Sequence, residues 1–143
     1  LLLWAFGPHV TRLDDVTTAP ASATATMATS TQGWQPWAPG APDALVASGR
    51  PVFVDFTAAW CVTCQYNKRT TLANADVLGD IAAKNVDLLR ADWTRRDPAV
   101  TAELARLGRN GVPVYAIHQN GQAPQVLSEV LGVDEVRAVI AGL

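Results

Sequence analysis

Apolar residues from position 34 onward follow patterns that alternate between strands and helices. The segment WQPW predicts a short edge strand, and PVFVDF, rich in β-branched and aromatic residues, predicts a buried one. VDLLRAD predicts the next strand. The segment VPVYAIHQNGQAPQVLSE predicts a hairpin that turns at Asn120–Gly121, because Asn-Gly is a preferred two-residue turn between paired strands.

Helical signals separate these strands. PDALVASG predicts a short helix that Gly49 stops. DPAVTAELARLG predicts a helix with Asp97 as its N-cap, Pro98 at its first position and Gly108 after its end. Three further helices are expected, at about 61–72, at about 76–83 and in DEVRAVIAG. This order of elements predicts an α/β fold, a central mixed β-sheet flanked by helices on both faces.

The N-terminal part of the chain has a different composition. No charged residue occurs from Val16 to Pro42, and TTAPASATATMATSTQG has neither a helical nor a strand period, so it predicts a linker. We expect residues 1–33 to be a tail and linker, and residues 34–143 to form the folded domain. The apolar start, LLLWAF, is far shorter than the roughly 20 residues of a membrane span. A packed or fraying tail and the trailing end of a transmembrane helix both remain open.

Length and charge narrow the classes of protein. A chain of 143 residues can bury the core of one domain without disulfide staples. The formal net charge is −2 and the sequence contains no basic run, which excludes nucleic acid as an expected partner. The chemistry must therefore be sought in particular residues.

The segment FTAAWCVTCQYNK holds both cysteines of the chain, Cys61 and Cys64. A structural disulfide across so short a loop contributes roughly 2 kcal/mol, against about 3 for a 15-residue loop. A structural zinc site needs four ligands, and only His9 and His118 are available as histidines. Haem attachment needs a histidine where Gln65 stands. Capture of Cu(I) by two thiolates stays open, because soft sulfur ligands suit that ion.

Dithiol–disulfide exchange fits the spacing best. A strand that runs into a helix places Cys61 at the helix N-terminus, where unpaired backbone N–H groups and the helix dipole stabilise a thiolate. The thiolate is the nucleophile, so Cys61 is the predicted attacking residue. Cys64, one turn further along, would release Cys61 from a mixed disulfide.

Further residues near the pair carry alternative interpretations. Asp55 interrupts an apolar strand, and it is either a proton acceptor for Cys64 or a solvent-facing residue near the strand end. Trp60 either shields the disulfide or belongs to the core. Val112–Pro113 opens a strand, and sequence alone favours a trans bond, because about 5–6% of such bonds are cis. His118 is expected at the surface of the hairpin.

The segments PVFVDFTAAWCVTCQ, ADWTRRDP and GRNGVPVY resemble the thioredoxin superfamily. More closely, they resemble the C-terminal periplasmic domain of DsbD-type thiol:disulfide interchange proteins, which include ScsB-type members. The resemblance covers roughly residues 34–143 and implies a thioredoxin-like fold. It also implies a domain at the periplasmic face of the bacterial inner membrane, with a membrane-embedded part of the same polypeptide as electron donor and periplasmic thiol or disulfide proteins as partners.

The resemblance implies roles for individual residues. Cys61 matches the nucleophile, Cys64 the buried partner, Asp55 the buried carboxylate that handles the proton, and Pro113 a cis-proline facing the disulfide. Val112 then offers backbone to an extended partner segment. Trp60 and the two residues between the cysteines complete the candidate partner contacts, which are Trp60, Val62, Thr63, Val112 and Pro113. The same topology makes LLLWAF the end of a transmembrane helix and Val16–Pro42 a tether.

Lys68 departs from the family pattern. It stands one helical turn after Cys64, where better-known members carry a glutamate that disfavours the thiolate. A cation facing the site acts in the opposite direction, so Cys61 is predicted to ionise more readily than in those relatives. The alternative is a solvent-facing lysine on a surface helix.

The resulting hypothesis is a protein-disulfide reductase domain whose cofactor is the redox-active disulfide Cys61–Cys64, without a metal or an organic group. Two alternatives remain. One is an oxidase or isomerase of the same fold, because local charge and the two residues between the cysteines set the reduction potential. The other is a Cu(I)-binding, copper-tolerance module that uses both thiols as ligands.

Overall fold

The computed structural model describes residues 33–143. Within them, five strands form one sheet in the order β1-β3-β2-β4-β5. Strand β2 is parallel to β3 and antiparallel to β4, so the sheet is mixed, as predicted. The strands are β1 (Trp34–Pro36), β2 (Val52–Thr57), β3 (Asp87–Asp92), β4 (Val114–His118) and β5 (Gln125–Val126).

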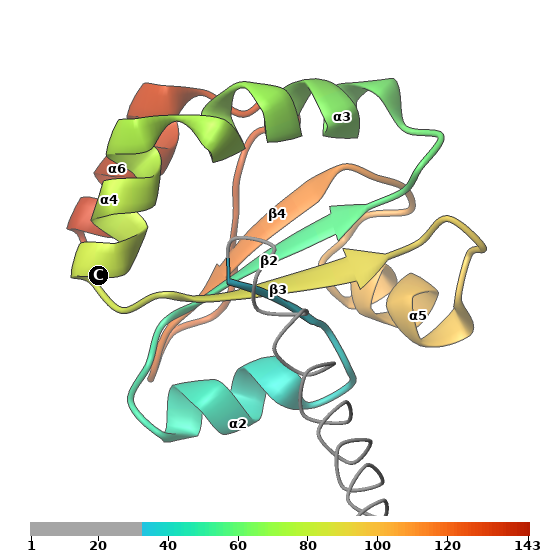
Figure 1. Ribbon diagram of the computed structural model, residues 1–143. Coiled ribbons are helices and arrows are strands. Elements are labelled where there is room, and N and C mark those ends of the chain that lie inside the picture. The colour runs from blue at the N-terminus through green and yellow to red at the C-terminus, as the bar shows by residue number, and fades with distance from the viewer. Residues whose placement is uncertain (1–32) are drawn as a thin grey trace, which may run out of the picture. The chain divides into compact units, whose positions relative to one another are not determined.

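Helices cover both faces of the sheet, which confirms the predicted α/β architecture. Figure 1 shows α3, α4 and α6 on one face and α2 and α5 on the other. The helices are α2 (Ala41–Ala47), α3 (Val62–Arg69), the 3-10 turn η2 (Thr71–Ala73), α4 (Ala75–Ala83), α5 (Pro98–Arg106) and α6 (Val133–Ala141).

Side chains of β2 alternate between these two layers, because successive residues of a strand point to opposite faces. Val52, Val54 and Phe56 belong to the core cluster that includes Val100 and Leu104 of α5. Asp55 therefore points toward the opposite face, under α3. This face carries the polar chemistry of the domain.

Local signals set several helix boundaries correctly. The side chain of Asp97 accepts hydrogen bonds from the backbone N–H groups of Ala99 and Val100, and Pro98 is the first residue of α5, as predicted. Asn74 caps α4 in the same way, through Asp76 and Val77. Side-chain capping of this kind satisfies N–H groups that the helix itself leaves unpaired.

The predicted helix over about 61–72 is wrong at its C-terminal end. Helix α3 stops at Arg69, and Thr70 has φ −109° and ψ −89°, outside the helical region. The hydroxyl of Thr70 donates to the carbonyl of Tyr66 at 2.8 Å, and that of Thr71 donates to the carbonyl of Leu131 at 2.6 Å. Two neighbouring threonines thus redirect the backbone by hydrogen bonds that compete with the helix.

The expected tether is too long at its C-terminal end. Its last residues, 34–42, contribute β1 and the start of α2. The tail at 1–32, including LLLWAF and His9, lies outside the described residues, and the boundary at residues 33/34 stays a prediction. Over residues 33–143, none of the helices has the length and apolar character needed to cross a membrane.

His118 is buried, so its expected surface position is wrong. It ends β4, which is buried along its whole length, and 9% of the side chain is exposed. Burial lowers the pKa of the imidazole. Its Nε2 atom has no hydrogen-bond partner among residues 33–143. The hairpin pattern predicted the strand, but it did not show that α2 and α5 cover this side of the strand.

Candidate active site

Cys61 and Cys64 form a disulfide at the start of α3, as predicted. Cys61 is the N-cap residue, with φ −91° and ψ 107°, and its Cα lies 5.2 Å from that of Cys64. Its Sγ accepts a hydrogen bond from the backbone N–H of Cys64 at 3.1 Å. The sulfur therefore occupies the position in which a helix stabilises negative charge.

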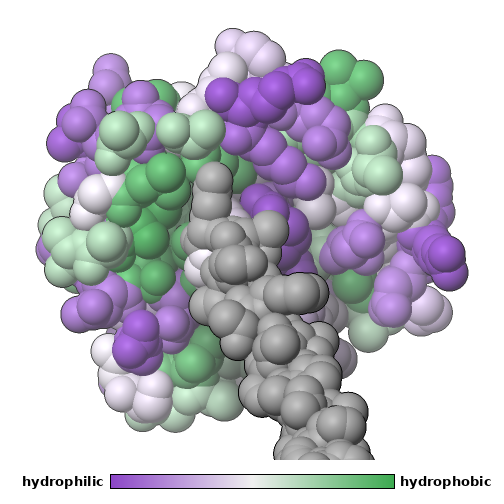
Figure 2. All heavy atoms as spheres, viewed as in Figure 1, coloured by the Kyte–Doolittle hydropathy of each residue, from purple (hydrophilic) through white to green (hydrophobic). Residues whose placement is uncertain are grey.

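The two cysteines differ in how far they are buried. Cys61 is 7% exposed, whereas Cys64 is fully buried. Both pack with Ala58, and Val112 lies against the same cluster. Figure 2 shows hydrophilic residues gathered over α3. Val62 and Tyr66 are the large hydrophobic side chains of this helix that are exposed. Cys61 is thus the less buried of the two cysteines, and Cys64 is closed to an approaching molecule.

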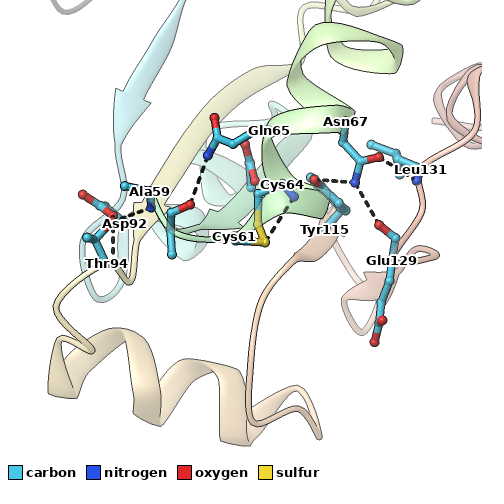
Figure 3. The surroundings of a disulfide bond; sticks show 12 residues. Ala59, Cys61, Cys64, Gln65, Asn67, Asp92, Thr94, Tyr115, Glu129 and Leu131 are labelled. Carbon is cyan, nitrogen blue, oxygen red and sulfur yellow. Dashed lines mark hydrogen bonds between the residues drawn. A yellow bond between two sulfur atoms is a disulfide. The ribbon is translucent and has the colours of Figure 1, made fainter.

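The loop before Cys61 is held by the loop that follows β3. The backbone N–H of Ala59 donates to the hydroxyl of Thr94 at 2.8 Å, and Nε1 of Trp60 donates to the carbonyl of Thr94 at 3.0 Å. Asp92 accepts from both the backbone N–H and the hydroxyl of Thr94 (Figure 3). These hydrogen bonds lower the pKa of Asp92. Sequence reasoning missed Thr94, although the segment ADWT contains it.

Trp60 is not a core residue, and it does not completely shield the disulfide. Its side chain is 49% exposed, and its ring lies 6.0 Å from that of the buried Trp93, measured between centroids. Trp93 belongs to the core cluster and Trp37 lies against it, while Trp34 is also buried. Trp60 therefore adds an exposed aromatic surface directly beside Cys61.

Pro113 is buried, and the Val112–Pro113 peptide bond is cis, whereas sequence alone favoured trans. The contact of Val112 with the disulfide cluster places this loop next to the cysteines. Thr63 is half-buried and Val62 is 81% exposed, so of the two residues between the cysteines Val62 is the more accessible.

Asp55 is fully buried, which rules out the solvent-facing alternative. It lies opposite Arg90 in the parallel pairing of β2 and β3, and Nε of Arg90 donates to its Oδ2 at 3.0 Å. Its Oδ1 has no hydrogen-bond partner among residues 33–143. Burial raises the pKa of Asp55, and the charges of Arg90 and Lys68 oppose that shift. The result is a buried carboxyl group with one oxygen free to accept a proton.

Lys68 is half-buried on α3, so it is not the solvent-facing lysine of the alternative interpretation. Together with Arg90 and Gln65 it lines a cavity of about 310 Å³ beside Ala58. Burial lowers the pKa of Lys68, and the like charge of Arg90 lowers it further, while Asp55 raises it. Lys68 and Asp55 therefore interact electrostatically across the layer that contains the disulfide.

Asn67 fixes the position of α3, a role that sequence reasoning missed. The side chain is fully buried, and its Nδ2 donates to the hydroxyl of Tyr115 at 2.9 Å and to the carbonyl of Glu129 at 2.8 Å. Its Oδ1 accepts from the backbone N–H of Leu131 at 3.2 Å (Figure 3). Because a buried amide without partners is costly, this network specifies one placement of the helix that carries both cysteines.

No group of three or more His, Cys, Asp or Glu side chains within residues 33–143 is arranged to hold a metal ion. The described residues instead bring Asp55, Lys68 and Arg90 within electrostatic reach of one another. Arg90 carried no sequence signal, because its partner is 35 positions away and the strand register decides the pairing.

A comparison with family models decides the relationship. Residues 33–119 match the model described as thioredoxin-like. The chain belongs to the thioredoxin-like family. Two curated relatives of this thioredoxin-like chain carry the name thiol:disulfide interchange protein DsbD. The one from Ralstonia nicotianae is 36% identical over 70% of the chain, and the one from Klebsiella pneumoniae is 32% identical over 68%. The chain spans 16% of the length of each.

Solved structures support the thioredoxin-like fold. The reduced C-terminal domain of Neisseria meningitidis DsbD has a TM-score of 0.59 at 22% identity, and the match covers 71% of this chain and 88% of that one. A thioredoxin from Thermus thermophilus has a TM-score of 0.59 at 19% identity, over 76% of this chain and 84% of the other. The curated relatives and the family model confirm the resemblance to DsbD-type proteins that the motifs indicated.

Proposed function

We propose that this chain is a thiol:disulfide reductase domain of a larger protein at the periplasmic face of the bacterial inner membrane. It receives electrons from a membrane-embedded domain of the same polypeptide and passes them through Cys61 and Cys64 to periplasmic disulfide proteins. The observation that carries the proposal is the disulfide between Cys61, the N-cap residue of α3, and the fully buried Cys64 one turn further along. The names of the two curated relatives support the same chemistry.

The first step is attack on the partner. In the reduced domain, the Cys61 thiolate attacks one sulfur of a partner disulfide, and the partner S–S bond breaks. The other partner sulfur leaves with the bonding electron pair and takes up a proton. A mixed disulfide now joins Cys61 to the partner. The backbone N–H of Cys64, which donates to the Cys61 sulfur, stabilises the thiolate before attack.

The second step releases the partner. Cys64 loses its proton to Asp55 and attacks the Cys61 sulfur, and the bond between Cys61 and the partner breaks. The partner sulfur leaves with the bonding electron pair and takes up a proton, so the partner departs as a dithiol that has gained two electrons, and Cys61–Cys64 is oxidised. Because Asp55 and α3 share one face of the sheet, the carboxyl group lies in the layer of the thiol that it serves. Return of two electrons from the membrane-embedded domain completes the cycle.

The direction of transfer can be tested by measuring the reduction potential of the chain against glutathione. We expect a potential well below −120 mV, the oxidising extreme for this class, together with reduction of insulin disulfides when dithiothreitol is supplied. A potential near −120 mV would identify an oxidase instead. In a parallel assay, the reduced chain is titrated with Cu(I) without oxygen. Tight, stoichiometric copper binding in the absence of any reductase activity would replace the proposal with a copper-binding module.

Lys68 is expected to favour the Cys61 thiolate. Replacing Lys68 by glutamate exchanges a cation for an anion in the layer that holds Asp55 and the cysteines. We expect the thiolate fraction of Cys61 at pH 7 to fall by at least about threefold, since an opposite charge favours and a like charge disfavours ionisation. Thiolate absorbance of the reduced chain, followed against pH, measures this fraction.

The matched control is Arg69→Glu, which makes the same change of charge at the next residue, where the side chain is exposed. Solvent and salt screen an exposed charge, so this variant should change the titration less. An unchanged or larger thiolate fraction in Lys68→Glu would show that Lys68 does not act on Cys61.

A further inference from the structure

Arg96 lies beside the active site, in a notch between two indole rings. Its guanidinium carbon is 5.0 Å from the ring centroid of Trp60 and 5.0 Å from that of Trp93. The two rings are tilted by 53° to each other, so they form a V that holds the cation. Trp60 is the sequence neighbour of Cys61. The guanidinium of Arg96 therefore lies next to the surface that a partner of Cys61 contacts.

The backbone holds Arg96 in this place. Its N–H donates to the carbonyl of Trp93 at 2.9 Å, and its φ of 54° is a left-handed conformation that non-glycine residues adopt rarely. The turn at the end of β3 thereby folds the side chain back over the two rings. A guanidinium on aromatic faces keeps its N–H edge available, because the ring contacts use its flat face.

Nearby carboxylates do not occupy that edge. Asp97 accepts hydrogen bonds from the first turn of α5, and Asp92 accepts from Thr94. Within residues 33–143, Arg96 forms no ion pair with any Asp or Glu, although other arginines of the domain do. The exposed side chain of Arg96 is therefore an oriented cation without a carboxylate partner in the described part of the chain.

We infer that Arg96 is a specificity residue that binds a carboxylate of the partner protein, an Asp or Glu close to the cysteine that Cys61 attacks. The inference rests on the proposed function, because it names the kind of partner segment that the same site takes. A forked guanidinium matches a carboxylate in geometry and charge, and complementary charge steers encounter as well as register. Trp60 supplies apolar contact and Arg96 supplies the charge selection.

The test uses three short peptides with blocked ends, in which one cysteine is flanked on both sides by Glu, Gln or Lys. Each cysteine is activated as a mixed disulfide with 4-thiopyridine. The thiolate of Cys61, in the full chain carrying Cys64→Ser, attacks the peptide sulfur; the peptide–pyridyl S–S bond breaks and 4-thiopyridone leaves with the electron pair and a proton. Its absorbance gives the rate constant. Dividing by the rate with 2-mercaptoethanol removes the intrinsic reactivity of each peptide.

At low salt we expect the Glu peptide to react about fivefold faster than the Gln peptide after this correction, as for a favourable exposed charge pair. The preference should shrink in 0.5 M NaCl, which screens exposed charges. Arg96→Gln should bring the ratio to about one, Arg96→Lys should restore part of it, and Arg96→Glu should favour the Lys peptide. Because each result is a ratio, a purely structural role of Arg96 in supporting Trp60 does not reproduce this pattern.

Arg95→Gln is the matched control, because it removes the same charge from the exposed neighbouring residue. Arg95 interacts with Asp92, whereas Arg96 lies over the ring of Trp60. A ratio that survives Arg96→Gln, or that Arg95→Gln lowers equally, overturns the assignment to Arg96. Failure of the proposed function looks different. In that case the chain reacts with the Gln peptide no faster than 2-mercaptoethanol does. If the chain reacts rapidly with the Gln peptide but shows no preference between the charged peptides, only the role of Arg96 is contradicted.

Discussion

Replacing Cys61 by serine is expected to reduce insulin reduction to the background rate of dithiothreitol alone. The hydroxyl of serine is not ionised at neutral pH and cannot form the mixed disulfide, so the covalent route is lost. Replacing Cys64 by serine leaves the first attack intact but removes the group that resolves its product. That variant should accumulate a covalent adduct with the partner, which dithiothreitol releases.

Mass spectrometry under non-reducing conditions measures the adduct. Its position needs no mapping, because the Cys64→Ser chain contains Cys61 as its single thiol. The double variant, which contains no thiol, is the control for adducts formed without cysteine. The assignment of roles would be reversed if Cys61→Ser formed the adduct as quickly as Cys64→Ser does. Such a result would mean that the buried sulfur of Cys64 is the one that meets partners.

Replacing Asp55 by asparagine is expected to slow the second step about a hundredfold or more, the effect usual for loss of a general base. The first attack should change far less, because it uses the Cys61 thiolate, whose proton Asp55 does not accept. Rapid mixing of the reduced chain with an activated disulfide peptide, followed by acid quenching, gives the amount of mixed disulfide against time. In Asp55→Asn this species should persist where wild type has already released the peptide.

The pH dependence of the second step gives an independent sign. Asp55 accepts the proton only as a carboxylate, so protonation at low pH removes the acceptor. Burial raises the pKa of Asp55. As the pH is lowered, the wild-type rate of the second step should therefore begin to fall at a pH above the ordinary pKa of an aspartate. The asparagine variant should lack this decline. If mixed disulfides of both chains resolve at one rate across this range, Asp55 is not the base.

Asp87→Asn is a suitable comparison for Asp55→Asn. Asp87 lies on the neighbouring strand β3, is only partly buried and pairs with Arg50 at 2.8 Å, at the opposite end of that strand from the loop at Thr94. An exposed ion pair contributes little to stability, so this change removes a carboxylate without disturbing the site. Resolution of the mixed disulfide should proceed at the wild-type rate.

Sequence reasoning succeeded where the signal is local. The start of α5 follows from Asp97 and Pro98, whose effects act within one helical turn. The cysteine pair is informative because its spacing and its place after a strand are both visible in thirteen residues. Asp55 was noticed because a carboxylate is conspicuous in an apolar strand, and the structure shows that this residue is fully buried.

Sequence reasoning failed where a partner comes from a distant part of the chain. Arg90 reaches Asp55 only because β2 and β3 pair in one particular register. Asn67 reads as an ordinary polar residue of a surface helix until the loop after β5 supplies Glu129 and Leu131. His118 was wrongly expected at the surface, since a strand pattern does not show which layer covers each face. The Val112–Pro113 dipeptide by itself favoured a trans bond, and only the family resemblance implied the cis bond that is found.

The sealed position of Cys64 has a kinetic consequence for the whole cycle. In the proposed cycle, the electron-donating domain and the accepting protein both react at Cys61, because Cys64 is fully buried. Donor and acceptor cannot both be bound at Cys61, so no ternary complex forms and one dissociates before the other binds. Turnover then follows a ping-pong scheme, in which donor and acceptor compete for one binding site.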